Sequence, residues 1–566
     1  MKISYEQNKL LLIALVVIAL LIVSSILFIV FFTDVDDVVD IEEPEGISRP
    51  ENYTVLMTMT WEEMQSMDLP SDFPIDDRVN PNLDEQAIFC EIVRIRARGI
   101  EEYMRKLGFE WRTPPSFYYV IQLHDTEHMS RVFSMWDTEF IRQEVFRRVD
   151  DGLETADVAI RIFEEQSVGF LGFRSDFVEV ESISLTYCFR TGRWTGDNYF
   201  GHPDGYGRFL GDEFELWFRL RQSTFDSDGI PCWVENNLLM TDPLIHDSDI
   251  DHSGDGIPTY WEWYWGFDPF NYSNHSGLDI SKDGLSNIDK FNLRSWHADP
   301  YQPEIYIEVD FMKGRPFGPD FVLFDESKQL LVDKFSQRKY HLTPWASKIT
   351  VLIDDGHMGG GGELIPHIRG HYNYWEGIIS EFYKNNFADE RKGVFRYLVI
   401  GDGSYVGKIV SGGWTQPQDH KGWYDTMWIG GSQLAFMAYY RGFNVRPKLQ
   451  RLVQAIQVMH ELGHTLGMVP GDPDPILEES ILGYTQYPGI DNASMGAIRY
   501  WSNYQSCMNY HMMYRPFVMR FFGKNYGLVL DYSDGSRDEP NHPDRNDWEV
   551  IDLRFFKQQV YIGGLE

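Results

Sequence analysis

The spacing of hydrophobic and polar residues predicts both strands and a helix in the first half of the chain. Polar and apolar residues alternate over residues 177–189 and 214–221, as they do in half-buried strands. Over residues 90–107, charged and apolar residues fall on separate helical faces, which predicts an amphipathic helix. We therefore expect residues 61–223 to form a mixed or β-rich domain, to which the sequence assigns no role.

The second half of the chain alternates strand and helix patterns. Ile305, Ile307 and Val309 alternate with polar residues over 304–311, and residues 348–353 and 395–400 are two further apolar strand candidates. A helical pattern over 327–337 separates the first two. Strand, helix and strand in this order predict a sheet with crossover helices.

A longer helix is predicted between Pro447 and Gly467. Leu452, Val453, Ile456 and Met459 recur at helical spacing, and a glycine beyond the last turn is a usual helix stop. The helix carries His460, Glu461 and His464 in the order H-E-x-x-H. Histidines four apart share one helical face, so both rings can bind one metal ion.

This arrangement is typical of zinc hydrolases, in which the ion polarises the scissile carbonyl and lowers the pKa of water. Glu461 would act as general base and later pass its proton to the leaving amine. The alternative is a buried amphipathic helix with two hydrogen-bonded core histidines. That interpretation leaves a glutamate unexplained beside an apolar stripe.

The string Ser506-Cys507-Met508-Asn509-Tyr510 follows downstream. With H-E-x-x-H-x-x-G ahead of it, the region from about residue 302 to the C-terminus resembles the metzincin clan of metalloproteases. The resemblance implies an α+β catalytic domain, with a twisted mixed sheet, crossover helices and an active-site helix. It also implies that Met508 lies in a turn beneath the zinc. Tyr510 would be an extra zinc ligand or a donor to the tetrahedral intermediate.

The third zinc ligand departs from the metzincin pattern, which places His or Asp six residues after the second histidine. Pro470 stands there and offers no ligand. Asp472 and Asp491 are equal candidates, and Glu478 or Glu479 would serve if the site followed the gluzincin layout. These alternatives stay open, and without any third ligand the site would be degenerate.

Three acidic loops precede the sheet region, at spacings of 27 and 28 residues. Oxygen ligands at positions 1, 3, 5 and 12, a carbonyl at 7 and a glycine at 6 form a calcium cage. The loops resemble thrombospondin type 3 and dockerin-like calcium repeats, so residues 224–301 are predicted to be an EF-hand-like calcium-binding arm. The candidate ligands are Asp226, Asp228 and Glu235 in the first loop, Asp251, Ser253, Asp255, Ile257 and Glu262 in the second, and Asp279, Ser281 and Asp283 in the third.

The third loop carries Lys290 at position 12, where its charge would repel the ion, and Asp289 is positioned to compensate. Calcium in these loops would be structural: it neutralises packed carboxylates and stiffens the arm.

Residues 10–32 are 23 residues without a charge, enough at about 1.5 Å per residue to cross a hydrocarbon core of about 30 Å. Lys2 and Lys9 precede them and four aspartates follow, so the bulk of the chain is predicted outside the cytoplasm. We predict a cytoplasmic tail over 1–9, a single-pass cell-membrane anchor over 10–32 and an acidic stalk over 33–60. A cleaved signal peptide is the alternative.

A net charge of −36 and a pI near 4.8 argue against nucleic acid as a partner. Cys90, Cys188, Cys232 and Cys507 contain no C-x-x-C pair, so a cysteine zinc site is not expected; disulfides and buried thiols both remain open. Asp354-Asp355-Gly356-His357 has metal-binding residue types, but we favour a polar turn after a strand.

The leading prediction is a membrane-anchored, extracytoplasmic zinc endopeptidase, with its protease domain over 302–566 and its structure stabilised by calcium. Its partner would be a protein or peptide substrate. The first alternative is a calcium-binding surface or adhesion protein with a degenerate protease domain. The second is a zinc enzyme that hydrolyses bonds other than peptides.

Overall fold

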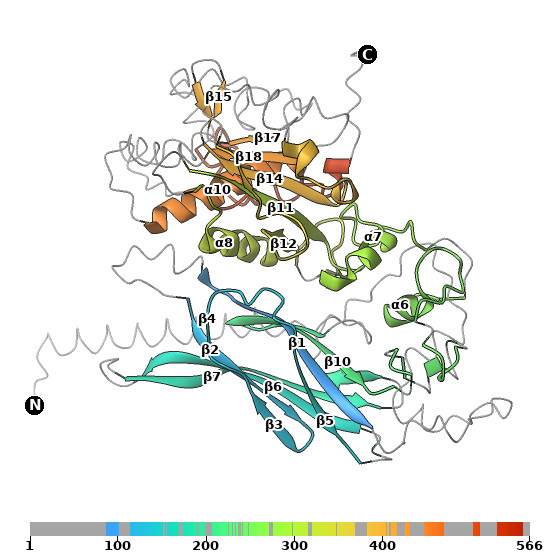
Figure 1. Ribbon diagram of the computed structural model, residues 1–566. Helices are drawn as coiled ribbons and strands as arrows, with labels where there is room; N and C mark the ends of the chain where they lie inside the picture. The colour runs from blue at the N-terminus through green and yellow to red at the C-terminus, as the bar shows by residue number, and fades with distance from the viewer. Residues whose placement is uncertain are drawn as a thin grey trace, which may run out of the picture. The chain divides into compact units, whose positions relative to one another are not determined.

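A computed structural model describes residues 86–557 with gaps (Figure 1). Residues 1–85 and 558–566 lie outside the described part. The internal gaps are 101–113, 151–152, 154, 169–173, 190–191, 198–206, 225, 229, 232–233, 236–238, 240, 247, 271–274, 297, 315–319, 347, 368–381, 403, 407–408, 412, 416–424, 431–446, 469–501 and 510–528.

The first described region consists of two antiparallel sheets. One has the order β5-β1-β10-β9 and the other the order β3-β2-β6-β7-β8, with β4 also paired to β2. Apolar residues from both sheets meet in one core, for example Ile92 and Leu216 with Ile121 and Ile160. The strands are β1 (Ala87–Ala97), β2 (Ser116–Leu123), β3 (Thr126–Met129), β4 (Phe133–Ser134), β5 (Gln143–Arg148), β6 (Thr155–Val168), β7 (Arg174–Cys188), β8 (Arg193–Gly196), β9 (Gly207–Leu210) and β10 (Phe214–Gln222).

Strands β7 and β10 confirm the two strands predicted from alternation. The helix predicted over 90–107 is wrong in its described part, because residues 90–97 belong to β1. The charges taken as a solvent-facing side are buried: Arg94 pairs with Asp137, and Arg96 pairs with Glu215. These arginines alternate with the core residues Ile95 and Ala97, so they lie on the other face of β1, where partners distant in sequence pair with them.

In the described part of the acidic loops, the helices with defined bounds are short. These are α6 (Thr259–Tyr264), α7 (Asn287–Asn292) and the 3-10 turn η3 (Arg294–Trp296). Trp263 packs with Ile230, Val234 and Leu239 in a small apolar cluster that joins the first two loops.

The second region is built on a mainly parallel sheet in the order β12-β11-β14-β18-β17, with β13 also paired to β11. Strand β17 is antiparallel to β18, and β15 and β16 form a separate hairpin. The strands are β11 (Glu304–Met312), β12 (Thr350–Asp354), β13 (Leu364–Ile365), β14 (Phe395–Gly401), β15 (Ser404–Val406), β16 (Ile409–Ser411), β17 (Gly413–Thr415) and β18 (Thr426–Gly430).

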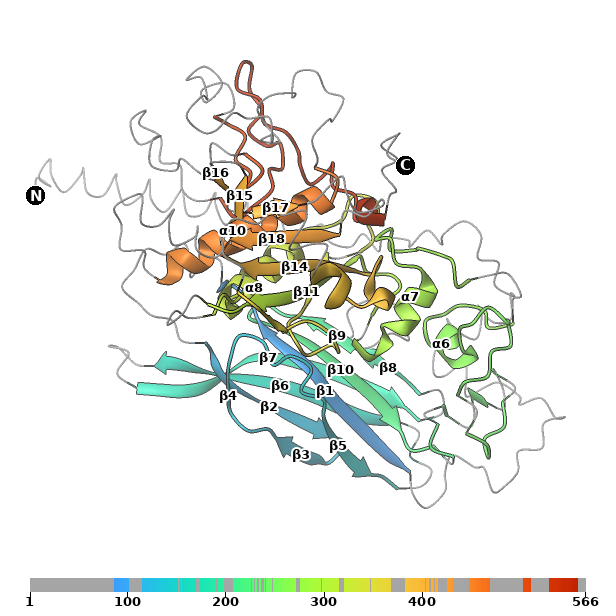
Figure 2. The ribbon, with the colours of Figure 1, turned by 45° about the horizontal axis from the view of Figure 1, so that its top comes forward.

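Helices α8 (Asp325–Ser336) and α10 (Pro447–Thr465) lie against this sheet (Figures 1 and 2). The region also contains two short 3-10 turns, η5 (Asp389–Arg391) before α10 and η8 (Phe555–Lys557) after it. The strands predicted over 304–311, 348–353 and 395–400 and the helices predicted over 327–337 and after Pro447 are confirmed, within one to three residues at most ends.

The sheet is buried on both faces. Ile305, Ile307 and Val309 of β11 pack with residues of α8 and α10, whereas Tyr306 of the same strand packs with Phe395 and Tyr397 on the other face. Burial on both faces explains why these strands are rich in branched apolar residues. Helix α10 is thus held on one face of the sheet by its apolar stripe.

The predicted fold class, an α+β protein with a metzincin-like catalytic domain behind a transmembrane helix, requires correction. Strands predominate among the described residues and helices are few. The first region is a two-sheet sandwich, because its long alternating segments bury β-branched and aromatic residues between sheets. The chain therefore consists of a two-sheet sandwich and a region built on a mainly parallel sheet, and the metzincin fold is not assigned to it.

The membrane prediction also requires correction. Of the helices that the structure describes, not one combines the length and the apolar character needed to cross a bilayer. The predicted anchor over 10–32 lies outside the described residues, as do the predicted tail over 1–9 and stalk over 33–60. The single-pass cell-membrane localisation is withdrawn accordingly.

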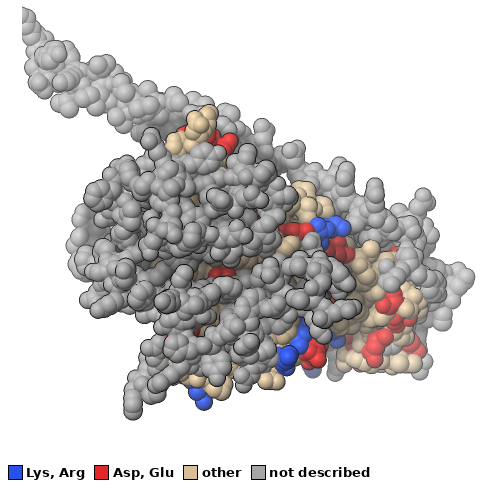
Figure 3. Space-filling model, turned by 90° about the horizontal axis from the view of Figure 1, so that it is seen from above, with Lys and Arg blue, Asp and Glu red and all other residues tan. Residues whose placement is uncertain are grey.

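On the described part of one face, acidic and basic side chains lie beside one another (Figure 3).

Candidate metal sites

Helix α10 brings His460, Glu461 and His464 to one buried face. His460 is 1% exposed and Glu461 is 5% exposed. The two imidazole rings lie with their centroids 4.8 Å apart and their planes 84° to one another. Both histidines therefore project to the same side of the helix, as their spacing predicts.

Each histidine is oriented by a backbone carbonyl. Nδ1 of His460 lies 3.0 Å from the carbonyl oxygen of Cys507, and Nδ1 of His464 lies 2.6 Å from that of Met468. A carbonyl oxygen only accepts hydrogen bonds, so each ring donates from Nδ1 and keeps an unprotonated Nε2. A metal-binding histidine needs this tautomer and this kind of outer hydrogen bond.

The surroundings also keep both rings neutral. Burial lowers the pKa of His460 to about 3, with a further contribution from His464, and burial lowers the pKa of His464 to about 4. Neutral imidazole is the form that binds a metal ion. Tautomer and charge therefore both fit a divalent cation at Nε2.

The turn at Ser506–Asn509 lies against the same helix. Met508 is fully buried, and its backbone N–H donates to Ser506 Oγ at 3.0 Å. A Cβ built on Gly463 would lie 2.6 Å from Sδ of Met508. A side chain at position 463 would therefore force the ends of Met508 and Met468 to shift away from the helix. The turn that carries Met508 also supplies the Cys507 carbonyl that holds His460, and the role of Met508 beneath a zinc ion stays a prediction.

Gly463→Ala is expected to displace Met508 and Met468, because the new methyl group would contact both side chains at 2.6 and 2.8 Å. Overpacking of this kind costs about 1–3 kcal/mol. Thermal unfolding and zinc content together test this: we expect a lower melting temperature and weaker zinc retention. Wild-type values for both would show that the Met508 contact does not organise the site.

Several predicted zinc-site residues lie outside the described part of the chain. They are Tyr510 and all the candidate third ligands, Asp472, Asp491, Glu478 and Glu479. Their assignments stay predictions.

The first two acidic loops each gather groups that could hold a metal ion. Asp226, Asp228 and Glu235 offer one oxygen each, and these atoms lie within 4.8 Å of one another. Asp255 and Glu262 of the second loop do the same with His275. His275 had no signal in the sequence, since it lies 13 residues beyond Glu262 and outside the loop pattern.

The second loop has the internal hydrogen bonds of a preformed cage. Asp251 accepts from the backbone N–H groups of Gly254 and Gly256 at 2.6 and 2.8 Å, and Ser253 Oγ donates to it at 3.0 Å. Gly256 has a φ of 93°, which a side chain would strain. Ile257 is buried directly after this turn.

Glu262 closes the second loop from α6. Its Oε1 lies 3.0 Å from Nδ1 of His275, and within the described chain its buried Oε2 has no hydrogen-bond partner. Burial raises the pKa of Glu262 to about 7, although the bond from His275 lowers it. A buried carboxylate oxygen without a hydrogen-bond partner is a suitable ligand for a cation.

The third loop is built differently, because a lysine ammonium lies among its carboxylates. Nζ of Lys290 lies 2.6 Å from Asp283 and 3.0 Å from Glu304 of β11, and it also donates to the Gln302 carbonyl at 3.1 Å. Burial alone would lower the pKa of Lys290, but Asp283 and Glu304 raise it. Asp279 accepts from the Gly284 N–H, and Ser281 is buried nearby in the chain.

Asp289 does not compensate for this lysine. Its carboxylate accepts from the Ser286 N–H at 2.9 Å in a capping box at the start of α7, and it lies 3.3 Å from Lys557. The third loop therefore has a side-chain cation among its carboxylates, whereas the first two loops gather groups that could hold a metal ion.

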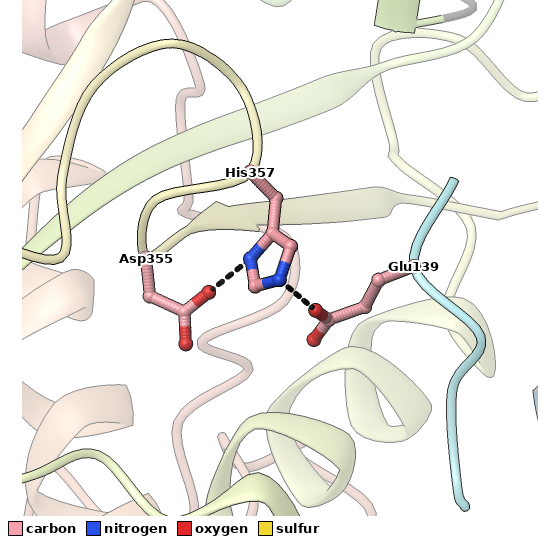
Figure 4. A group of neighbouring side chains, drawn as sticks. All are labelled: Glu139, Asp355 and His357. Atoms are coloured by element: carbon pink, nitrogen blue, oxygen red, sulfur yellow. Dashed lines mark hydrogen bonds and ion pairs between the residues drawn. The ribbon is translucent and has the colours of Figure 1, made fainter. Parts of the chain in front are cut away.

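A third group of possible ligands joins distant segments (Figure 4). Nδ1 and Nε2 of His357 face Asp355 at 2.9 Å and Glu139 at 3.1 Å. Lys328 lies 2.7 Å from Asp355 and 3.5 Å from Glu139, so a cation already accompanies these carboxylates. The predicted polar turn at Asp354–His357 is found, whereas Glu139, held at a φ of 42°, had no sequence signal.

Among the described cysteines, Cys90 and Cys507 are buried thiols. Burial raises the pKa of both, which makes them unreactive. Cys232 lies outside the described residues.

Comparison with known proteins adds little. No protein-family model matches the sequence, and no curated protein matches it. The chain is similar in part to a calcium-bound pair of C2 domains from extended-synaptotagmin 2, at 13% identity and a TM-score of 0.16 over 24% of this chain and 45% of that one. It is also similar to human GIVD cytosolic phospholipase A2 in complex with an inhibitor, at 10% identity and a TM-score of 0.16 over 24% of this chain and 17% of that one. The chain thus spans less than half of either structure, and likenesses at such scores support no conclusion about fold or function.

Proposed function

We propose that this protein is a zinc-dependent peptidase whose metal is bound by His460 and His464. The observation that supports the proposal is the pair of Nδ1 bonds to the Cys507 and Met468 carbonyls, which leaves both Nε2 atoms in the unprotonated form that binds a metal ion. Core histidines kept only for packing would have no need of a common tautomer. Glu461, next in sequence to His460 on the same helix, is the group that this interpretation explains and packing does not.

When bound, zinc supplies a Lewis acid that polarises a carbonyl and lowers the pKa of water. The chain's own groups supply the rest. Glu461 accepts a proton from the attacking water and delivers it to the leaving amine. The Cys507 and Met468 carbonyls keep the two rings in place throughout. Gly463 and Met508 fix the distance between helix and turn.

Hydrolysis of unfolded protein substrates by the purified protein tests the proposal. We expect cleavage that zinc chelation stops and zinc addition restores. A protein that binds no zinc and cleaves nothing would support the alternative, a calcium-binding surface protein with a degenerate site. Zinc binding with cleavage of only non-peptide bonds would point to a different hydrolase.

We propose further that the first and second acidic loops bind calcium, whose preferred ligands are oxygens. The grouping of Asp226, Asp228 and Glu235, and the buried Oε2 of Glu262 beside Asp255, support this. His275 then orients Glu262 by its hydrogen bond and is not itself an oxygen ligand. The third loop is left out of the proposal, because Lys290 already neutralises Asp283.

Calcium is expected to raise the melting temperature of the chelated protein, by an amount equivalent to about 2.7 kcal/mol for each of the two sites when its concentration is a hundred times Kd. Asp228→Asn combined with Asp255→Asn should remove most of this response. The matched control is Asp279→Asn in the third loop, which should lower stability but keep the calcium response. A response lost in the control and kept in the double variant would contradict the assignment.

A further inference from the structure

Two glutamines three residues apart on α10 have opposite environments. The Gln454 amide is fully used: its Nε2 donates to the Val322 carbonyl at 2.8 Å, and its Oε1 accepts from the Phe324 N–H at 3.0 Å. The Gln457 side chain is equally buried, at 1% exposure. Yet among the residues that the structure describes, neither its Oε1 nor its Nε2 has a hydrogen-bond partner.

A buried amide without partners is costly. Native proteins satisfy nearly all buried polar groups, and an apolar side chain of the same size would pack there without loss. An unsatisfied amide therefore needs an explanation other than stability.

The position of Gln457 on the helix suggests an explanation for its unsatisfied amide. His460, Glu461 and His464 follow it at three, four and seven residues, and these spacings define a single helical face. Gln454, three residues before Gln457, lies on the same side of the helix, but its amide is taken up by Val322 and Phe324 in the segment that leads into α8. Gln457 thus continues the row of candidate zinc ligands one turn toward the start of the helix.

We infer that Gln457 is a substrate-binding residue, whose amide pairs with a backbone peptide group of an extended substrate next to the bond being cleaved. A primary amide offers two donor hydrogens and an acceptor oxygen, and a substrate peptide group offers one of each in return. The matching chemical class is a polypeptide. The inference rests on the proposed peptidase function and deepens it.

Gln457→Met and Gln454→Met form a matched pair that tests the inference. Each replaces an amide by an apolar side chain of similar length. We expect Gln457→Met to keep or raise the melting temperature and to keep bound zinc, while kcat/KM for the best fluorogenic peptide falls at least tenfold. Gln454→Met should lower the melting temperature and leave kcat/KM within twofold. A lower melting temperature with wild-type kcat/KM in Gln457→Met would overturn the inference.

Peptide affinity, measured in the Glu461→Gln background, separates this inference from the proposed function. The probe is the same labelled peptide, and fluorescence anisotropy reports binding without turnover. We expect Gln457→Met to weaken binding at least fivefold. Replacing single backbone N–H groups of the peptide by ester oxygens should weaken binding at one position in the parent and at none in Gln457→Met. Equal affinities in both proteins, or no peptide binding at all, would overturn the inference, whereas a wild-type protein without zinc-dependent cleavage would overturn the proposed function.

Discussion

Glu461→Gln is expected to reduce peptide hydrolysis by about a hundredfold to ten-thousandfold, the usual contribution of general acid–base catalysis. Glutamine keeps the size of the side chain but cannot accept the proton of the attacking water. Zinc content and melting temperature should stay at wild-type values, since His460 and His464 keep their own bonds to Cys507 and Met468. Steady-state kinetics with metal analysis on the same preparation measures both.

The control for this variant is Glu326→Gln. Glu326 lies on α8 and pairs with Arg451 of α10 at 2.8 Å, so it has the same side chain next to the same helix. We expect near-normal kcat/KM for this control. Full activity in Glu461→Gln would show that Glu461 is not the general base. Equal losses of kcat/KM in both variants would indicate a disturbed helix rather than the loss of a catalytic group.

Lys290→Met is expected to destabilise the folded protein by about 3–5 kcal/mol, the range for removing one partner of a buried ion pair. The ammonium is 1% exposed, and its loss leaves Asp283 buried without its counter-charge, while Glu304 keeps only Arg208 as a counter-charge, at 3.1 Å. Urea unfolding, with midpoints and slopes compared, measures the change. Lys392→Met is the matched control: Lys392 pairs with Asp389, which is exposed, and such pairs contribute about 0–1 kcal/mol.

Lys290→Glu tests whether the third loop binds calcium once its lysine is replaced by an acidic residue. It restores an acid at position 12 beside Asp279 and Asp283, where the other loops have a glutamate. We expect a protein that is unstable in chelator and recovers with calcium. If Lys290→Met and Lys392→Met cost the same, the ammonium does not replace an ion in this loop.

The predictable parts of this structure depend on local pattern. Helix α10 follows from apolar spacing between Pro447 and a glycine at 467, and β11 follows from the alternation of Ile305, Ile307 and Val309. The two zinc-ligand candidates share a face because helical geometry requires it. The first two loops likewise gather their carboxylates because their spacing fits one cage.

The features that sequence could not predict depend on distant partners. Residues 90–107 were expected to be helical because charged and apolar residues fall on separate helical faces, whereas Arg94 and Arg96 of β1 are paired with Asp137 and Glu215 from distant segments. His275 joins Glu262 across a chain reversal, and Glu139 reaches His357 from another region of the sequence. Lys290 was expected to repel an ion, but only the fold shows that its ammonium reaches Glu304 on β11.

Metal analysis of the purified protein tests the central claim most directly. The account predicts one zinc ion per chain in the wild type, lost when His460 and His464 are both replaced by glutamine. Zinc absent from the wild type under zinc-replete conditions, or retained in full by the double variant, would contradict it.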